Sequence, residues 1–114
     1  MRRGEVWLVN LDPTIGAEIK KTRPAVIVND DAIGILPLKV IVPITDWKDR
    51  YAVAQWMVRI DPDAENGLTK ISAADAFQVR SVAQERLTQR IGELSEPLME
   101  KITTALAVVL GIEI

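Results

Sequence analysis

The sequence of 114 residues contains no cysteine and no histidine. The absence of cysteine excludes disulfide bonds, thiolate zinc sites and cysteine nucleophiles. The absence of histidine removes the side chain that most often acts as a general base near neutral pH, and also the commonest ligand of transition metals. The usual hydrolase active sites are therefore unavailable, and any catalysis must depend on other groups.

Long apolar runs are also missing. None approaches the roughly 18 to 20 residues that cross a bilayer, and the basic pair Arg2 and Arg3 is followed by an alternating stretch instead of a secretory signal. We therefore expect no membrane span and a cytoplasmic location. The balance of 48% hydrophobic and 26% charged residues is typical of one compact domain, which we expect to span residues 1–114. A domain this small leaves much of its surface in water, which favours dimerisation.

Charge is nearly balanced, with 14 basic and 16 acidic residues, so overall charge does not predict nucleic-acid binding. The first 23 residues are nevertheless locally basic through Arg2, Arg3, Lys20, Lys21 and Arg23. This distribution predicts a basic side. The acidic residues of segment 61–65 do not fit a calcium-binding loop, because Pro62 interrupts them and the later ligands are missing. We expect no metal site and no cofactor.

Short runs rich in β-branched and aromatic residues predict strands. They cover residues 4–11, 25–28, 38–42, 55–60, about 72–82 and 86–94, the last also being compatible with a helical turn. Pro43 cannot donate to a sheet ladder, so we expect it near a strand end or on an edge, with Ile44 and Thr45 leading into a loop. Trp7 and Trp56 fall inside strand patterns and are expected in the core.

One helix is predicted at the C-terminal end. Ser95 is a suitable N-cap, Pro97 lies in the first turn, and apolar residues then recur at spacings of three and four until Gly111. Two polar loops are expected, over residues 14–22 after the turn at Asp12-Pro13 and over residues 46–51. The sequence thus predicts a mainly β fold with a C-terminal α-helix.

Arg23 begins one predicted strand and Thr45 follows the next. If these strands pair antiparallel, both side chains lie at the same end of the sheet. A guanidinium matches two phosphate oxygens and a hydroxyl donates to a third, so the pair suits a phosphodiester. Taken alone, however, an arginine at a strand start is commonly only solvated or ion-paired, and a threonine there is commonly a strand or turn residue.

Several segments spread over nearly the whole chain carry a family resemblance. They are Gly4-Glu-Val-Trp7, Asp12-Pro13, Gly16-Ala-Glu18, Arg23-Pro-Ala-Val-Ile-Val28, Pro43-Ile-Thr45 and Gln78-Val-Arg-Ser81. In this order, followed by a final helix, they resemble the MazF/PemK family of toxin endoribonucleases. The resemblance implies an SH3-like small β-barrel (MazF/PemK/CcdB-like) with a terminal helix, a twofold homodimer and a cognate antitoxin.

The resemblance also implies cleavage of single-stranded RNA, usually messenger RNA, within a short preferred sequence. The ribose 2′-hydroxyl attacks the adjacent phosphorus and leaves a 2′,3′-cyclic phosphate and a 5′-hydroxyl, without a metal ion. The catalytic arginine and threonine of the family match Arg23 and Thr45. Glu18 matches an acidic position in the first loop and is the candidate acceptor of the 2′-proton.

The side chains expected to contact RNA come from both loops and from the segment near residue 80. They are Lys20, Lys21, Trp47, Lys48, Arg50, Tyr51, Gln78 and Arg80. The two aromatic residues are expected to stack on bases. Gln78 and Arg80 are expected to face the RNA groove or the dimer seam, because alternate residues of a strand share a face. Phe77 stands where many family members carry an acidic residue, so no acidic role is expected at that position.

The sequence leaves two alternative hypotheses about function open. A CcdB-type toxin has a similar fold but traps DNA gyrase without cutting RNA, and it depends on an aromatic residue in its C-terminal tail, whereas this sequence ends without one. The chain could also be an inactive homologue that acts only within a regulatory complex.

Overall fold

The computed structural model describes residues 1–33 and 35–113. Within them the chain forms seven strands, four short 3-10 helices and one α-helix. In chain order these are β1 (Glu5–Asn10), β2 (Thr22–Ile27), η1 (Asp31–Ile33), β3 (Leu38–Asp46), η2 (Asp49–Val53), β4 (Met57–Ile60), β5 (Ser72–Asp75), η3 (Ala76–Gln78), β6 (Arg80–Ala83), η4 (Gln84–Arg86), β7 (Leu87–Glu93) and α1 (Glu96–Leu110).

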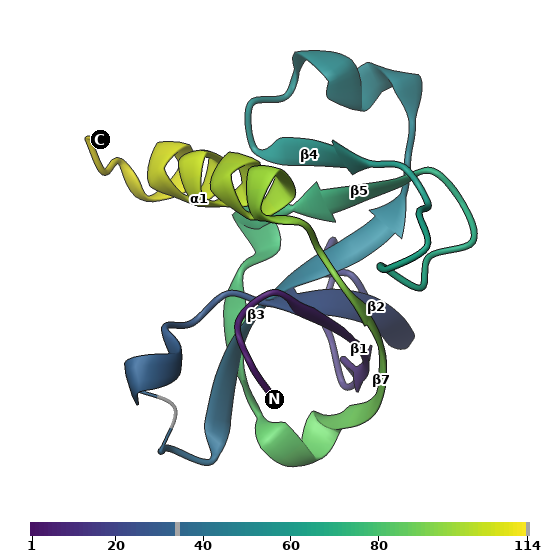
Figure 1. Cartoon of the computed structure of the whole chain (residues 1–114). Coiled ribbons are helices and arrows are strands. Elements are labelled where there is room, and N and C mark those ends of the chain that lie inside the picture. The colour runs from purple at the N-terminus through teal and green to yellow at the C-terminus, as the bar shows by residue number, and fades with distance from the viewer. Residues whose placement is uncertain (34, 114) are drawn as a thin grey trace.

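The strands form one antiparallel sheet in the order β4-β5-β3-β2-β1-β7, with β6 also paired to β3. The expected mainly β class with a C-terminal helix is confirmed. No pairing joins the outer strands β4 and β7 in the part of the chain that the structure describes, so the small barrel is an open one. In Figure 1, β4 and β5 lie next to α1, while β1 and β7 lie away from it.

Strand β3 connects the two halves of the sheet. Its first part pairs with β2 up to Ala25 opposite Pro43, and its last part pairs with β5 from Ile44 opposite Ala74. The expectation that Ile44 and Thr45 lead into a loop is therefore wrong, since both belong to the strand. On the edge of β3 away from β2, the strand pairs with β6 up to Ile41 and with β5 from Ile44. Pro43 lies between these two ladders, where a missing N–H is tolerated.

Two further expectations for strands need correction. The extended stretch predicted over residues 72–82 is interrupted by η3, so Gln78 lies in a 3-10 turn and not in a strand. Strand β4 begins only at Met57, which leaves Trp56 outside the ladder with 39% of its surface exposed. Trp56 packs edge-to-face on the exposed ring of Phe77 instead of entering the core.

Two apolar clusters lie on opposite faces of the sheet. The larger one, which includes Val42, Ile44, Val58 and Ile60, is covered by α1 through Met99, Ile102 and Ala105. The smaller one includes Val9, Ala25 and Ile41, with Trp7 and Ile19 packed against it. The predicted helix limits are confirmed: the Ser95 side chain accepts a hydrogen bond from the Leu98 N–H, and Gly111 ends the helix with a φ of 68°. No helix of the described residues is both long and apolar enough to cross a bilayer.

Candidate active site

Arg23 and Thr45 lie on the face of the sheet that α1 does not cover. Ala25 pairs with Pro43, and continuing this register by two residues in each strand sets Arg23 opposite Thr45. Val26 and Ile44 belong to the cluster that α1 covers. Arg23 lies three residues before Val26 and Thr45 lies one residue after Ile44, so the side chains of Arg23 and Thr45 point to the other face of the sheet. Each is half-buried, and the Arg23 Nε donates to the Lys20 carbonyl at 3.3 Å. The structure thus brings the predicted pair to one face and one end of two neighbouring strands.

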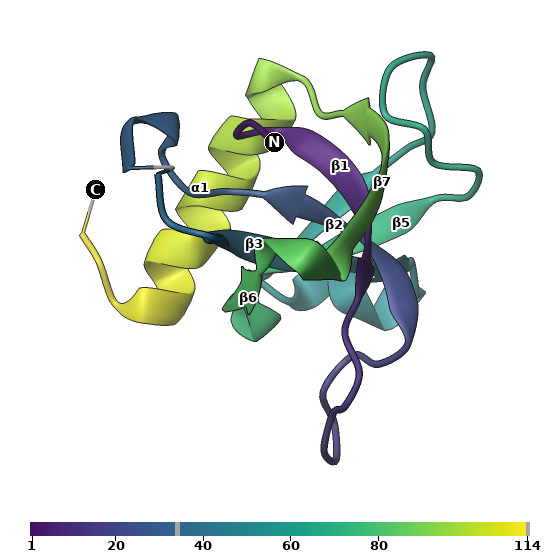
Figure 2. The ribbon, with the colours of Figure 1, turned by 90° about the horizontal axis from the view of Figure 1, so that it is seen from below.

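The first predicted loop follows β1 and projects from the body of the molecule at the bottom of Figure 2. Hydrogen bonds from the Leu11 N–H to the Lys21 carbonyl and from the Lys21 N–H to the Asp12 carboxylate, each 3.0 Å, close its base. Lys21 has a φ of 69°, and the side chains of Lys20 and Lys21 are exposed. The two lysines therefore present their charge to solvent beside the start of β2, where Arg23 lies.

Glu18, near the tip of this loop, has two partners. Its Oε1 accepts a hydrogen bond from the Ile15 N–H at 2.6 Å, and its Oε2 lies 3.6 Å from Arg80 Nη1. The Glu18 side chain is still 49% exposed, so solvent screens this ion pair. The structure places Glu18 with Arg80, and this contact joins the loop to β6.

Gln78 and Arg80 both hold the loop. The Gln78 Oε1 accepts from the Ile19 N–H at 2.6 Å, and its Nε2 donates to the Ala17 carbonyl at 3.3 Å. Arg80 Nη2 donates to the Leu11 carbonyl at 3.3 Å. Among the residues that the structure describes, none offers a hydrogen-bond partner to the buried Nε of Arg80. The expectation that these two residues share a strand face is wrong for Gln78, but both converge on the loop that carries Glu18.

We predict that Gln78→Ala loosens this loop without unfolding the domain. A hydrogen bond contributes about 0.5–1.5 kcal/mol, so loss of the bond to Ile19 should speed amide exchange there by about two- to tenfold. Hydrogen–deuterium exchange resolved to residues 15–21 measures the change. Gln89→Ala, which alters an exposed glutamine of β7, is the matched control and should leave the loop unchanged. Equal exchange at Ile19 in wild type and Gln78→Ala would contradict the prediction.

Asp75 is a buried acid on the same face as Thr45. It ends β5, two residues from Ala73, which pairs with Thr45. Burial raises the pKa of Asp75 above its ordinary value, against the opposing effect of hydrogen bonds from Phe77 and Gln78. The Phe77 N–H donates to Asp75 at 3.1 Å. Asp75 thereby orders the turn from which Gln78 reaches the loop.

The second predicted loop forms a cluster of aromatic rings and guanidinium groups. Trp47 and Tyr51 pack edge-to-face with 5.9 Å between ring centroids. The Arg50 guanidinium carbon lies 5.3 Å from the Tyr51 centroid, and that of Arg59 lies 5.6 Å from the Trp47 centroid. Lys48 is exposed beside them. These distances are those of cation–π contacts, so the rings are pre-positioned by their cationic neighbours.

Sequence reasoning missed two arginines near these loops. Arg86 donates from Nη1 to the carbonyls of Asn10 and Asp12, which ties the base of the first loop to η4. Arg59 contacts Trp47 from β4. The alternating pattern of the strand was the signal that could have found Arg59, but no sequence signal linked Arg86 to a loop more than 70 residues away. Among the described residues, no group of three or more acidic side chains is placed to hold a metal ion.

Fold and site together define a class: a small, open antiparallel β protein whose helix-free face combines guanidinium, hydroxyl and aromatic groups, the set that phosphodiesters and bases require. The family model described as "PemK-like, MazF-like toxin of type II toxin-antitoxin system" matches residues 2–110. The chain belongs to this family.

The relatives agree with this assignment. The chain is 35% identical over 112 residues to endoribonuclease MazF9 of Mycobacterium tuberculosis, covering 93% of this chain and 92% of the relative. It is 32% identical to endoribonuclease PemK of Escherichia coli, covering 96% of this chain and 82% of the relative. A solved mycobacterial endoribonuclease in complex with its cognate antitoxin superimposes with a TM-score of 0.79 at 24% identity, covering 100% and 98%. The crystal structure of MazF from Deinococcus radiodurans superimposes with a TM-score of 0.79 at 21% identity, covering 98% of this chain and 97% of that chain. At these identities the solved structures establish the shared fold.

Proposed function

We propose that this chain is an endoribonuclease toxin that cleaves single-stranded RNA within a preferred sequence and without a metal ion. The observation that carries the proposal is the register of β2 and β3, which sets Arg23 and Thr45 on one face and at one end of their strands. Relatives at 32–35% identity are named endoribonucleases, which supports RNA as the substrate. The expected RNA contacts are Lys20, Lys21, Trp47, Lys48, Arg50, Tyr51, Gln78 and Arg80.

The chemistry needs no group that the chain lacks. The ribose 2′-oxygen attacks the adjacent phosphorus, the bond from phosphorus to the 5′-oxygen breaks, and the products are a 2′,3′-cyclic phosphate and a 5′-hydroxyl. Arg23 stabilises the charge that develops on the phosphorane, since its guanidinium stays protonated and donates in a fixed fork. Thr45 orients the phosphate through its hydroxyl.

Glu18 is the candidate acceptor of the 2′-proton. Its carboxylate lies near the loop tip, half-exposed and beside Arg80. In this proposal, RNA that binds along the face of Arg23 and Thr45 reaches Glu18 on the loop that precedes β2. The 5′-oxygen leaves with a proton taken from solvent or from a neighbouring donor.

We also propose two protein partners. An antitoxin is supported by the solved relative that is described in complex with its cognate antitoxin. A second copy of the chain is supported by exposed apolar residues on one side of the molecule, left in Figures 1 and 2, where the β2–β3 connection and the end of α1 both lie. These residues are Ile33, Ile35, Leu36, Leu38, Val108, Leu110 and Ile112. Messenger RNA as substrate implies action in the cytoplasm.

The test is cleavage of a long single-stranded RNA in the presence of EDTA. We expect fragments that end in a 2′,3′-cyclic phosphate, and we expect a single 2′-deoxy substitution at a mapped cut site to abolish cleavage there while other sites are still cut. The loss follows because the attacking hydroxyl is gone. Cleavage that requires a divalent metal, or that persists at the 2′-deoxy site, would refute the mechanism. Inhibition of gyrase supercoiling without RNA cleavage would favour the CcdB-like alternative.

A further inference from the structure

The row of side chains that contains Thr45 continues across the sheet to Arg59. Thr45 pairs with Ala73 in β5, and Ala73 pairs with Arg59 in β4. Residues paired in adjacent strands share a face, and the neighbours Ile44, Ala74 and Val58 all belong to the helix-covered cluster. Arg59 therefore leaves the sheet on the same face as Thr45.

The residue between Thr45 and Arg59 in this row is Ala73, whose side chain is a single methyl group. Two strand spacings of about 4.8 Å put the two backbones about 10 Å apart, which is the length of a short stacked run of nucleotides at about 3.4 Å each. Trp47 follows Thr45 by two residues, and the centroid of its ring lies 5.6 Å from the guanidinium carbon of Arg59. The row of Thr45, Ala73 and Arg59 thus presents a hydroxyl and a second guanidinium, and the Trp47 ring lies beside it.

Arg59 is available for a ligand. Its side chain is 51% exposed, and its ion pair, to Asp61 at 3.0 Å, joins it to a side chain that is 68% exposed. Such exposed pairs contribute little and give way readily to a better anion. Contact with Trp47 restricts the guanidinium, so less conformational entropy is lost when it binds a phosphate.

We propose that Arg59 binds a phosphate of the RNA strand one to three nucleotides away from the scissile phosphate, with Trp47 held by Arg59 as a platform for a neighbouring base. This proposal rests on the proposed function and extends it to a second phosphate subsite. An acidic protein segment is the competing occupant, but the continuity of the row with Thr45 favours the strand that Thr45 orients. In the reaction Arg59 is a binding residue and takes no part in bond breaking.

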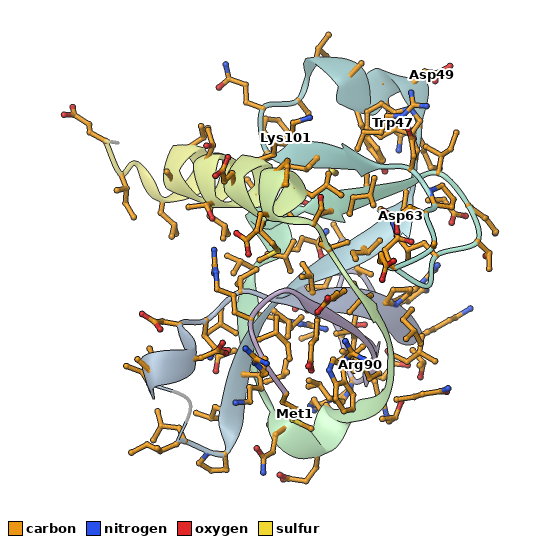
Figure 3. All side chains as sticks on the ribbon, in the orientation of Figure 1. Met1, Trp47, Asp49, Asp63, Arg90 and Lys101 are labelled. Atoms are coloured by element: carbon orange, nitrogen blue, oxygen red, sulfur yellow. The ribbon has the colours of Figure 1, made fainter. Side chains whose placement is uncertain are left out.

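The experiment separates binding from cleavage by using a single-stranded oligonucleotide of about twelve nucleotides in which every sugar is 2′-deoxy. Fluorescence anisotropy gives Kd over a range of salt concentrations for wild type, Arg59→Ala, Arg59→Lys and Arg90→Ala. Arg90 is a matched control, an arginine of β7 with 48% exposure that pairs with Glu5 and Glu93. Figure 3 shows Arg90 well away from Trp47, and β7 and β4 are the outermost strands of the sheet.

We expect Arg59→Ala to raise Kd by about three- to tenfold and to make the slope of log K against log salt shallower by about 0.7, the value for one phosphate contact on a single strand. Arg59→Lys should retain the slope because it keeps the charge, and Asp61→Asn should tighten binding because it frees the guanidinium. Cleavage of RNA by Arg59→Ala should show a raised KM with kcat nearly unchanged. Arg90→Ala should keep the wild-type slope.

The proposal would be refuted if wild type and Arg59→Ala had equal slopes of log K against log salt. It would also be refuted if Arg90→Ala lost as much affinity for the oligonucleotide as Arg59→Ala. If wild type still cuts RNA in that case, the proposed function stands and only the second subsite is wrong. If wild type neither cuts RNA nor binds the oligonucleotide, both fail. If Arg59→Ala loses binding of a poly-glutamate peptide and not of the oligonucleotide, the surface serves a protein partner and the subsite is likewise wrong.

Discussion

Arg23→Ala is expected to cut single-stranded RNA about 100- to 1,000-fold more slowly than wild type. Removal of one donor that stabilises a developing negative charge typically costs about 2.7–4 kcal/mol of transition-state stabilisation, because the charge then has to be solvated by mobile water. Single-turnover cleavage of a defined RNA, with enzyme in excess, measures the rate of the chemical step. The loss should appear in kcat, since Lys20, Lys21 and Arg59 remain to bind the strand.

Arg23→Lys gives the more informative comparison. It preserves the positive charge but not the two-pronged donor geometry, so an intermediate rate is expected. Arg23 is only half-buried, and its Nε makes a single long contact with the Lys20 carbonyl, so neither variant should change the circular dichroism spectrum or Tm appreciably. If Arg23→Ala is folded and cuts at the wild-type rate, the assignment of the active site is wrong.

Ile102→Ala is expected to lower the free energy of unfolding by about 2–5 kcal/mol, as large-to-small substitutions in a packed core do. Ile102 lies fully buried in α1 at the contact with the larger apolar cluster, so its removal leaves a cavity between helix and sheet. Urea unfolding followed by tryptophan fluorescence measures the change, and Tm should fall by roughly 4–8 °C per kcal/mol.

Thr104→Ala in the same helix is the matched control for this substitution. Thr104 is exposed and lies outside the apolar patch proposed for the dimer, and alanine has the higher helix propensity, so little or no destabilisation is expected. Similar losses in the two variants would mean that α1 does not cover the sheet as the structure shows. Ile102→Ala should also keep the wild-type rate per folded molecule at low temperature, since Arg23 and Thr45 lie on the other face of the sheet.

In the proposed mechanism, the face that Arg23, Thr45 and Arg59 share allows a chain without histidine to act on a phosphodiester. The attacking group belongs to the substrate, so the protein has to position the strand and stabilise charge, which guanidinium and hydroxyl groups do at any working pH. Gln78 and Arg80 hold the loop that precedes Arg23, and the Trp47 ring lies against the Arg59 guanidinium.

Local sequence signals predicted the structure correctly where the interactions that decide it join residues close together in the sequence. Ser95 and Gly111 marked the limits of α1 because capping involves only residues within one turn. The alternating pattern of β1 and the polar character of the loop before Arg23 likewise reflect neighbouring residues. These signals predicted a mainly β chain with a final helix, and the resemblance of its motifs supplied the family.

Only the tertiary structure decided features that depend on distant partners. Pro43 remains inside β3 because it lies between the ladders to β6 and β5. Trp56 is exposed because β4 starts two residues later than predicted, and its ring packs on Phe77. Arg59 joins the row of Thr45 through a register set by segments near residues 45, 59 and 73. Sequence patterns by themselves determined the mainly β class and the limits of the final helix, because those depend on neighbouring residues. Long-range strand pairing determined which side chains meet, because register is fixed by packing across the whole sheet.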